Sequence, residues 1–105
     1  MHKLTLIRHA KAQVGSVELE DHQRGLTRQG QKDASRLAEV LVKRGEVFDR
    51  IICSTASRTR QTLESISVAL GMEEGDYSYR DDLYHASKQK LFDMIQTTPE
   101  DVTHL

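Results

Sequence analysis

Residues 48–70 read FDRIICSTASRTRQTLESISVAL, and this stretch predicts a buried strand that runs directly into a helix. Residues 48–53 are short, apolar and partly β-branched, as the strands of a sheet core usually are. Either Ser54 or Thr55 can cap the helix that follows, and Gly71 is a suitable stop for it. One face of this helix is predicted to carry Thr59, Leu63, Ile66 and Leu70.

The same alternation of strand and helix occurs earlier in the chain. Residues 3–7 (KLTLI) form a short apolar run, which predicts a buried strand. Residues 11–24 are polar and show no period, which indicates a surface loop. Thr27 can cap a helix that runs to about Arg44 and stops at Gly45. The inward positions of that helix are predicted to be Ala34, Leu37, Ala38 and Leu41.

The alternation continues to the end of the chain. A weaker strand is predicted within residues 77–84, and Ser87 can cap a third helix that ends before Pro99. Its inward positions are predicted to be Leu91, Met94 and Ile95. The chain of 105 residues therefore predicts one α/β domain over residues 1–105, a three-layer α/β/α sandwich with a mostly parallel sheet.

Composition narrows the class of protein. Hydrophobic residues make up 37% and charged residues 30%, which is typical of a soluble globular domain. Fifteen Lys and Arg against sixteen Asp and Glu argue against nucleic acid as a partner. The N-terminal apolar run is too short for a signal peptide or a membrane span, so we expect a cytoplasmic protein that binds no membrane. The single cysteine, Cys53, excludes an internal disulfide, and no His/Cys cluster indicates a metal or cofactor.

Two polar segments follow predicted strands, where the ligand sites of such sheets lie. Arg8-His9 follows the first strand, and residues 54–58 lead into the second helix, whose N-terminal N–H groups favour an anion. Arg58, in the first turn, can make a two-pronged contact with a phosphate, whereas Arg60 faces elsewhere. The alternative interpretation is a surface arginine beside a loop histidine, and an ordinary capped helix with two solvated arginines.

Three segments together resemble the histidine phosphatase superfamily. Residues 6–10 (LIRHA) are similar to its RHG signature, residues 21–30 (DHQRGLTRQG) to its D-x-x-R-P-L-T-x-x-G segment, and residues 53–62 (CSTASRTRQT) to its S-P-x-x-R-A-x-Q-T segment. The resemblance covers essentially the whole chain, and the short spacing is most similar to the SixA-like phosphohistidine phosphatase branch. The departures are Ala10 for glycine, Gly25 for proline, Thr55 for proline and Thr59 for alanine.

The resemblance implies a phosphoglycerate-mutase-like fold and a role for each matching residue. His9 would attack phosphorus and become transiently phosphorylated. Arg8 and Arg58 would hold the phosphoryl oxygens as the other catalytic residues, and Arg24 would bind the substrate beside them. Independently of the resemblance, His85 follows the predicted strand at residues 77–84 and is a candidate for binding the substrate. The chemistry agrees, because a nucleophilic histidine must be neutral and neighbouring arginines favour the neutral ring. The same cations stabilise the charge of the transition state without a metal.

The resemblance also implies a part that this sequence does not match. The family carries a second histidine, in a Gly-His motif at the end of a late apolar strand. Here residues 101–105 read DVTHL, and His104 follows Thr103 without a preceding apolar run. We therefore expect His104 to be a strand-start or tail residue, and the domain to be incomplete at its C-terminus, lacking the last strand and helix. The exposed sheet edge left behind predicts a homo-oligomer.

The sequence thus predicts a hydrolase: a phosphatase of phosphohistidine or of a small phosphoester, with a phosphorylated protein or small phosphoester as its partner. The competing hypothesis is a non-catalytic module that binds phosphate or a phosphoprotein and has lost the second histidine. A general acid at Asp81 or Asp82 is a weaker hypothesis. A cysteine phosphatase is disfavoured, because Cys53 and Arg58 are five residues apart and that chemistry needs six. Cys53 is then a buried strand residue.

Overall fold

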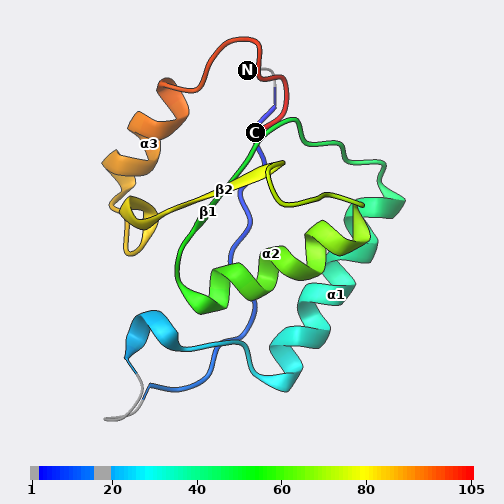
Figure 1. Cartoon of the computed structure of the whole chain (residues 1–105), viewed down its shortest axis with the longest axis vertical. Coiled ribbons are helices and arrows are strands. Elements are labelled where there is room, and N and C mark those ends of the chain that lie inside the picture. Colours follow the sequence, from blue (N-terminus) through cyan, green and yellow to red (C-terminus); the bar gives the residue numbers. More distant parts are fainter. Residues whose placement is uncertain (1–2, 16–19) are drawn as a thin grey trace.

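Helices and short parallel strands alternate along the chain, as the sequence predicts. The computed structural model describes residues 3–15 and 20–105. The predicted loop at residues 11–24 has no helix or strand up to residue 15, and its residues 16–19 lie outside the described part. The elements in chain order are the 3-10 helix η1 (Asp21–Gln23), α1 (Arg28–Lys43), β1 (Ile51–Ser54), α2 (Ser57–Ala69), β2 (Tyr77–Arg80), the 3-10 helix η2 (Asp81–Leu83) and α3 (Lys88–Gln96) (Figure 1).

Helix α1 begins and ends at the predicted residues. The Thr27 hydroxyl accepts a hydrogen bond from the Gly30 N–H at 2.9 Å, which satisfies one free donor of the first turn. After the helix, Gly45 has a φ of +66°, a conformation in which glycine carries no steric penalty. The cap and the stop therefore confirm the sequence-based prediction for this helix.

The sheet contains two parallel strands among the described residues, and both are shorter than predicted. Strand β1 pairs with β2 in the register Ile51↔Tyr77 to Ser54↔Arg80. The expected strand start at residues 48–50 was wrong, because the N–H groups of Asp49 and Arg50 point to the carbonyl of His104 instead of β2. At the other end, the chain leaves β2 through η2.

The predicted cap of α2 was wrong. The helix starts at Ser57 with Ala56 as its N-cap, and no side chain caps it. Ser54 is the last residue of β1, and its hydroxyl accepts from the Ala56 N–H at 3.3 Å. This donor belongs to the N-cap residue and not to the first turn of the helix. The Thr59 hydroxyl closes the junction by donating to the Ser54 and Ala56 carbonyls. A strand-to-helix turn of only two residues thus leaves little room for the usual cap.

The core lies between α1 and α2. Ala38 and Leu41 of α1 contact Ile66 of α2, and each of these side chains is 6% exposed or less. Half-buried side chains surround them: Leu37, Phe48 and Leu70. Helix α2 also packs on β1, so the two-stranded sheet joins the core through that helix. The apolar faces predicted for both helices are confirmed.

The predicted strand at residues 3–7 is neither a regular strand nor buried. Its backbone pairs only with residues 103–105, through the bonds Lys3 N–H to Thr103 and Thr5 N–H to Leu105. Leu6 is 72% exposed. A groove of about 430 Å³ separates this segment from β1 and is lined by apolar side chains from both, with Leu63 and Ile66 of α2 among them. A strand is buried only when neighbours cover it, and the described residues pair with this segment only at residues 3–5.

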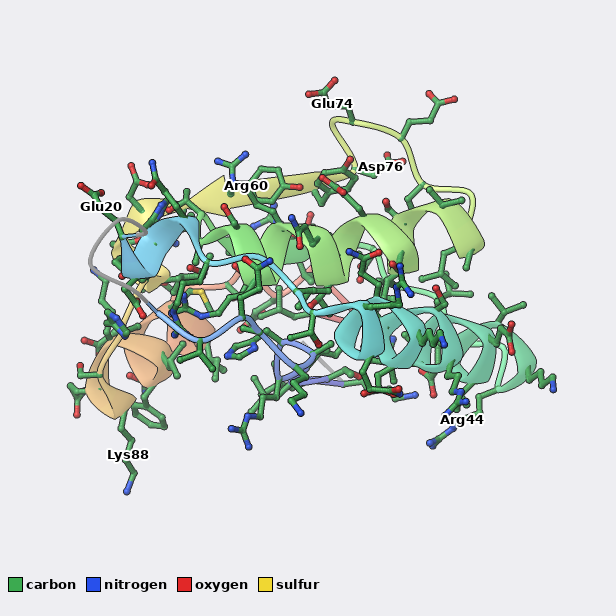
Figure 2. All side chains as sticks on the ribbon, turned by 90° about the horizontal axis from the view of Figure 1, so that it is seen from below. Glu20, Arg44, Arg60, Glu74, Asp76 and Lys88 are labelled. Atoms are coloured by element: carbon green, nitrogen blue, oxygen red, sulfur yellow. The ribbon has the colours of Figure 1, made fainter. Side chains whose placement is uncertain are left out.

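Helix α3 lies apart from the α1–α2 pair (Figures 1 and 2). Ser87 caps it as predicted, by accepting from the Lys90 N–H at 3.1 Å. The expected inward packing is wrong for Leu91, which is 37% exposed, while Met94 is half-buried at the groove. Within the described residues, no helix is long and apolar enough to cross a membrane.

Candidate active site

Arg58 is the most buried of the predicted phosphate-binding side chains. It lies in the first turn of α2, and its side chain is 8% exposed. Its Nη1 donates to the Asp21 carbonyl at 2.8 Å, and its Nη2 donates to Asp21 Oδ2 at 3.2 Å. The guanidinium also lies 5.7 Å from the centre of the Tyr84 ring. These contacts fix the direction of Arg58 toward η1.

Arg24 reaches the same carboxylate from the other side. Its Nε and Nη2 lie 3.0 and 2.8 Å from Asp21 Oδ1, and its Nη1 donates to the Gln13 carbonyl at 2.6 Å. Because Arg24 directly follows η1, the short helix presents an arginine and its counter-ion on one side. Arg24 and Arg58, which are far apart in the sequence, are therefore brought together as predicted.

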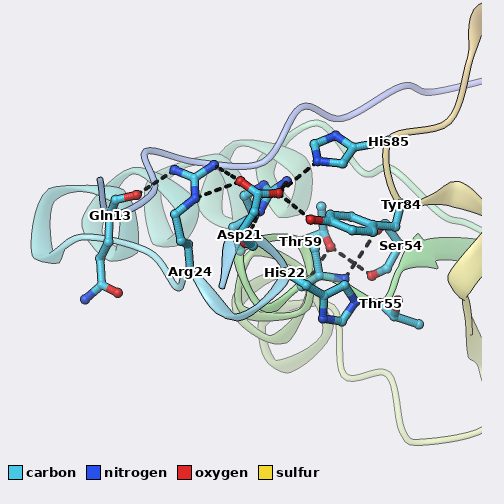
Figure 3. A network of polar contacts seen from close by, with 11 residues as sticks. Gln13, Asp21, His22, Arg24, Ser54, Thr55, Thr59, Tyr84 and His85 are labelled. Carbon is cyan, nitrogen blue, oxygen red and sulfur yellow. Dashed lines mark hydrogen bonds and ion pairs between the residues drawn. The ribbon is translucent and has the colours of Figure 1, made fainter. Parts of the chain in front are cut away.

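His85 joins this group with Tyr84. The Tyr84 hydroxyl donates to Asp21 Oδ2, and His85 Nε2 lies 2.9 Å from the same oxygen. His85 has a φ of +50°, an uncommon backbone conformation for a residue with a side chain. We call these five residues the Asp21 cluster: Asp21, Arg24, Arg58, Tyr84 and His85 (Figure 3).

The electrostatics of the cluster keep Asp21 ionised. The hydrogen bond from Tyr84, followed by those from Arg24 and His85 and the charge of Arg58, holds the pKa of Asp21 well below its usual range. The same contact with Asp21 raises the pKa of the Tyr84 hydroxyl, which stays protonated as a donor. Sequence reasoning missed both residues, although Asp21 opens the DHQRGLTRQG segment.

His9 and Arg8 lie outside the hydrogen bonds of the Asp21 cluster. His9 is half-buried, and its Nδ1 lies 2.7 Å from the Ala10 carbonyl. A carbonyl only accepts, so Nδ1 carries the proton, and in the neutral ring Nε2 keeps its lone pair. Arg8 is exposed and lines the groove with His9. The structure thus identifies the carbonyl that selects the tautomer of His9.

A buried threonine links the His9 segment to the Arg58 helix. The Ala10 N–H donates to Thr62 Oγ1 at 3.1 Å, and the Thr62 hydroxyl donates to the Arg58 carbonyl at 2.8 Å. His22 lies 2.9 Å from Thr55 through its Nε2, which ties η1 to the loop before α2. The three segments of the predicted signature therefore meet at one end of the sheet.

The weaker candidates take structural positions. Asp82 pairs with Arg80 at 2.6 Å and Lys90 at 3.1 Å, and these contacts lower its pKa to about 2, so it is no proton donor near neutral pH. Burial raises the pKa of the half-buried Cys53 thiol, which donates to the Ser54 carbonyl. Arg60 stacks on the Tyr79 ring and lies exposed at the surface (Figure 2).

His104 lies in the tail after α3, where an isolated bridge takes the place of a strand. It bridges Lys3 in a parallel pair, and its ring is buried. Its Nδ1 donates to the Val47 carbonyl at 2.7 Å, and its Nε2 lies 2.7 Å from the Thr5 hydroxyl. Both ring nitrogens are thus engaged, Nε2 with the N-terminal segment and Nδ1 with the residues before β1. Within the described ranges, no group of three or more His, Cys, Asp or Glu side chains is placed to hold a metal ion.

Comparisons with known proteins show the family and the fold of the chain. The model of the histidine phosphatase superfamily (branch 1) matches residues 4–85. A candidate phosphohistidine phosphatase SixA from Agrobacterium tumefaciens has a TM-score of 0.84 and 32% identity, over 92% of this chain and 62% of that chain. Its counterpart from Nakamurella multipartita has a TM-score of 0.78 and 34% identity, over 98% of this chain and 55% of that chain.

Two further relatives differ in what they add. The protein histidine phosphatase SixA in complex with tungstate has a TM-score of 0.82 over 96% of this chain and 64% of that chain; at 22% identity it supports the fold alone. An uncharacterised chloroplastic protein of Arabidopsis thaliana is 39% identical over 64 residues, which are 61% of this chain and 29% of the relative. The chain therefore spans less than two thirds of the length of each of these proteins.

Proposed function

The chain belongs to branch 1 of the histidine phosphatase superfamily, and from this premise we propose that it carries the nucleophile of a phosphatase that acts on phosphohistidine or a small phosphoester. In this proposal His9 attacks phosphorus and is transiently phosphorylated, Arg8 and Arg58 hold the phosphoryl oxygens, and Arg24 and His85 bind the substrate. The complete domain would be the three-layer sandwich of the phosphoglycerate-mutase type that the sequence predicts.

The observation that carries the proposal is the tautomer of His9. The Ala10 carbonyl, 2.7 Å from Nδ1, leaves Nε2 as the atom with a free lone pair. Attack through Nε2 forms an N–P bond as the bond from phosphorus to the leaving group breaks. Water then breaks the N–P bond and returns the neutral ring. The carbonyl holds the ring orientation through both steps, because it accepts from the same N–H throughout.

The arginines of the proposed site can stabilise the negative charge of the phosphoryl group. A phosphoryl group spreads negative charge over its equatorial oxygens in the transition state, and a planar guanidinium can bind two of them at once. Arg58 is held in the first turn of α2, where the free N–H groups of the helix add to the positive field. A substrate imidazole is a good leaving group and needs little acid assistance, which favours phosphohistidine.

One observation favours the competing proposal of a non-catalytic module. Arg24, Arg58 and the imidazole of His85 all contact the carboxylate of Asp21. A site built this way can bind phosphate without turnover. A cytoplasmic location and a homo-oligomer remain proposals from the sequence.

The experiment compares phosphate release from a phosphohistidine peptide and a generic phosphoester by the wild-type chain and His9→Ala, with Gln31→Ala at an exposed position of α1 as the control. We expect wild-type turnover, loss to background in His9→Ala, and retention in Gln31→Ala. Mass spectrometry of an acid-quenched reaction should find the phosphoryl group on His9. Wild-type protein that binds phosphate but never releases it from a substrate would support the module instead.

A further inference from the structure

The carboxylate of Asp21 is surrounded by donors in the way that a bound oxyanion would be. Its Oδ1 lies 3.0 and 2.8 Å from Nε and Nη2 of Arg24. Its Oδ2 lies 3.2 Å from Arg58 Nη2 and accepts from two further side chains, those of Tyr84 and His85. Five donors from three separate segments therefore converge on one carboxylate (Figure 3).

These donors are the ones that the proposed function assigns to the phosphoryl group. Both terminal nitrogens of Arg58 contact residue 21, one through the carbonyl and one through the carboxylate. Three nitrogens of Arg24 are engaged with Asp21 and the Gln13 carbonyl. A phosphate that is to make two-pronged contacts with these guanidiniums has to take donors that the carboxylate now holds.

We propose that Asp21 is an internal competitor of the substrate: its carboxylate occupies the oxyanion donors of Arg24, Arg58 and His85 until a phosphoryl group displaces it. This inference rests on the proposed function, because that function assigns these three side chains to the substrate. It adds a residue that controls phosphate affinity to a site whose other members only attract phosphate.

Asp21 is built so that its side chain can leave while its backbone stays. The side chain is 41% exposed, so a rotation about its bonds brings the carboxylate into water. The Asp21 carbonyl meanwhile keeps its 2.8 Å contact with Arg58 Nη1, and His22 keeps η1 tied to Thr55. The carbonyl thus positions Arg58, and the carboxylate only fills the donors beside it.

Protonation does not release this carboxylate near neutral pH, since its neighbours keep it ionised. The negative charge is therefore removed from the cluster only by movement. An incoming phosphoryl group carries more charge and more acceptor oxygens than one carboxylate, and it can satisfy the same donors. Exchange of one anion for the other leaves none of the arginine donors unpaired, which lowers the cost of the exchange.

The test measures the dissociation constant of inorganic phosphate at neutral pH by calorimetry or by amide shifts in NMR. Asp21→Asn keeps the shape and the backbone carbonyl but removes the charge. We expect it to bind phosphate about tenfold more tightly than wild type. Asp82→Asn, which makes the same change in charge at the exposed Arg80 pair, should stay within about twofold. Unchanged or weaker binding by Asp21→Asn overturns the inference.

A second variant decides the matter if Asp21→Asn does not fold. Tyr84→Phe keeps the ring beside Arg58 but removes one donor to the carboxylate, so phosphate should bind about two- to threefold more tightly. Equal or weaker binding counts against the inference. Binding needs no turnover, so tighter binding without phosphatase activity contradicts the proposed function alone. Turnover without tighter binding contradicts only the role of Asp21.

Discussion

The α1–α2 pair and the segment at residues 3–9 both carry large apolar side chains but differ in how far these are covered. Leu41 and Ile66 are 6% and 3% exposed, whereas Leu6 and Ile7 are 72% and 41% exposed. A helix satisfies its backbone within itself and needs only one partner face, which α1 and α2 give each other. An extended segment needs neighbours at both edges and both faces. Among the described residues, the helix pair meets its requirement, whereas the extended segment pairs at one edge, where residues 3–5 meet residues 103–105.

The largest effect should come from shortening a buried side chain in the contact between α1 and α2. Ile66→Ala removes buried methylene groups from the contact with Ala38 and Leu41, and we expect it to lower the free energy of unfolding by about 2–5 kcal/mol. Leu6→Ala, a truncation of similar size in the exposed segment, should change it by less than about 0.5 kcal/mol. Urea unfolding followed by circular dichroism compares the two. Equal losses would show that the exposed segment is as well packed as the helices.

A second effect tests the contact between α1 and Lys11, two residues beyond the extended segment. A Cβ added to Gly30 in α1 would lie 2.1 Å from the Lys11 carbonyl oxygen, which also accepts from the Thr27 N–H. Gly30→Ala should therefore destabilise the fold by about 1–3 kcal/mol, although alanine is the better helix former. Gln31→Ala, at the next and exposed position, should be nearly neutral in the same unfolding experiment. A more stable Gly30→Ala would mean that the contact with Lys11 yields at little cost.

A smaller effect concerns the N-terminal caps of α1 and α2. Thr27→Ala removes the hydroxyl that accepts from Gly30, and we expect a loss of about 1 kcal/mol. Helix α2 has no side-chain cap, so Ser54→Ala, at the position predicted to cap it, should cost less than Thr27→Ala. Thermal melts of the two variants rank them. A larger loss for Ser54→Ala would show that its 3.3 Å bond to the Ala56 N–H is what stabilises α2.

The smallest effect is local and depends on pH. The N–H groups of Thr103 and then His104 lower the pKa of Asp49 from 3.8 to about 2. A carboxyl whose pKa is lowered by folding adds stability that is complete above its unfolded pKa and is lost as the pH falls through the folded value. The amides of residues 103–105 should therefore lose protection from hydrogen exchange between about pH 4 and pH 2, before those of α1.

Asn substitution separates this effect from general acid unfolding. Asp49→Asn should loosen the same three amides at neutral pH, while Asp33→Asn, on the exposed side of α1, should not. Simultaneous loss of protection in α1 and in residues 103–105 would show that the two regions unfold as one unit. It would contradict the expectation that the terminal segments open before the helix pair.

The sequence predicts the helices well because their signals are local. The Thr27 cap, the Gly45 stop and the apolar positions of α1 lie within one stretch of chain, and each is confirmed. The burial of residues 3–7 depends on segments distant in sequence, so an apolar pattern alone could not decide it. The expected cap at Ser54 or Thr55 failed for a related reason, because the pattern does not fix where β1 ends.

The candidate site divides in the same way. The family resemblance identified Arg24 and Arg58, the position after a predicted strand identified His85, and the fold brings these three together. It did not identify Asp21 as their common partner, because the residues that meet there come from η1, α2 and the turn after η2. Which nitrogen of His9 is free also depends on a carbonyl contact, and no residue pattern specifies that.

The pairing of residues 3–5 with residues 103–105 has a consequence for the order of folding. A ribosome synthesises residues 103–105 about a hundred positions after residues 3–5. Both helices of the core can pack in that interval, since their contacts close much shorter loops. The segment around His9 is then held to the core through the Ala10–Thr62 hydrogen bond until residues 103–105 are synthesised. The proposed nucleophile would thus be synthesised well before residues 103–105, and its segment would be fixed in place only after the helix core has formed.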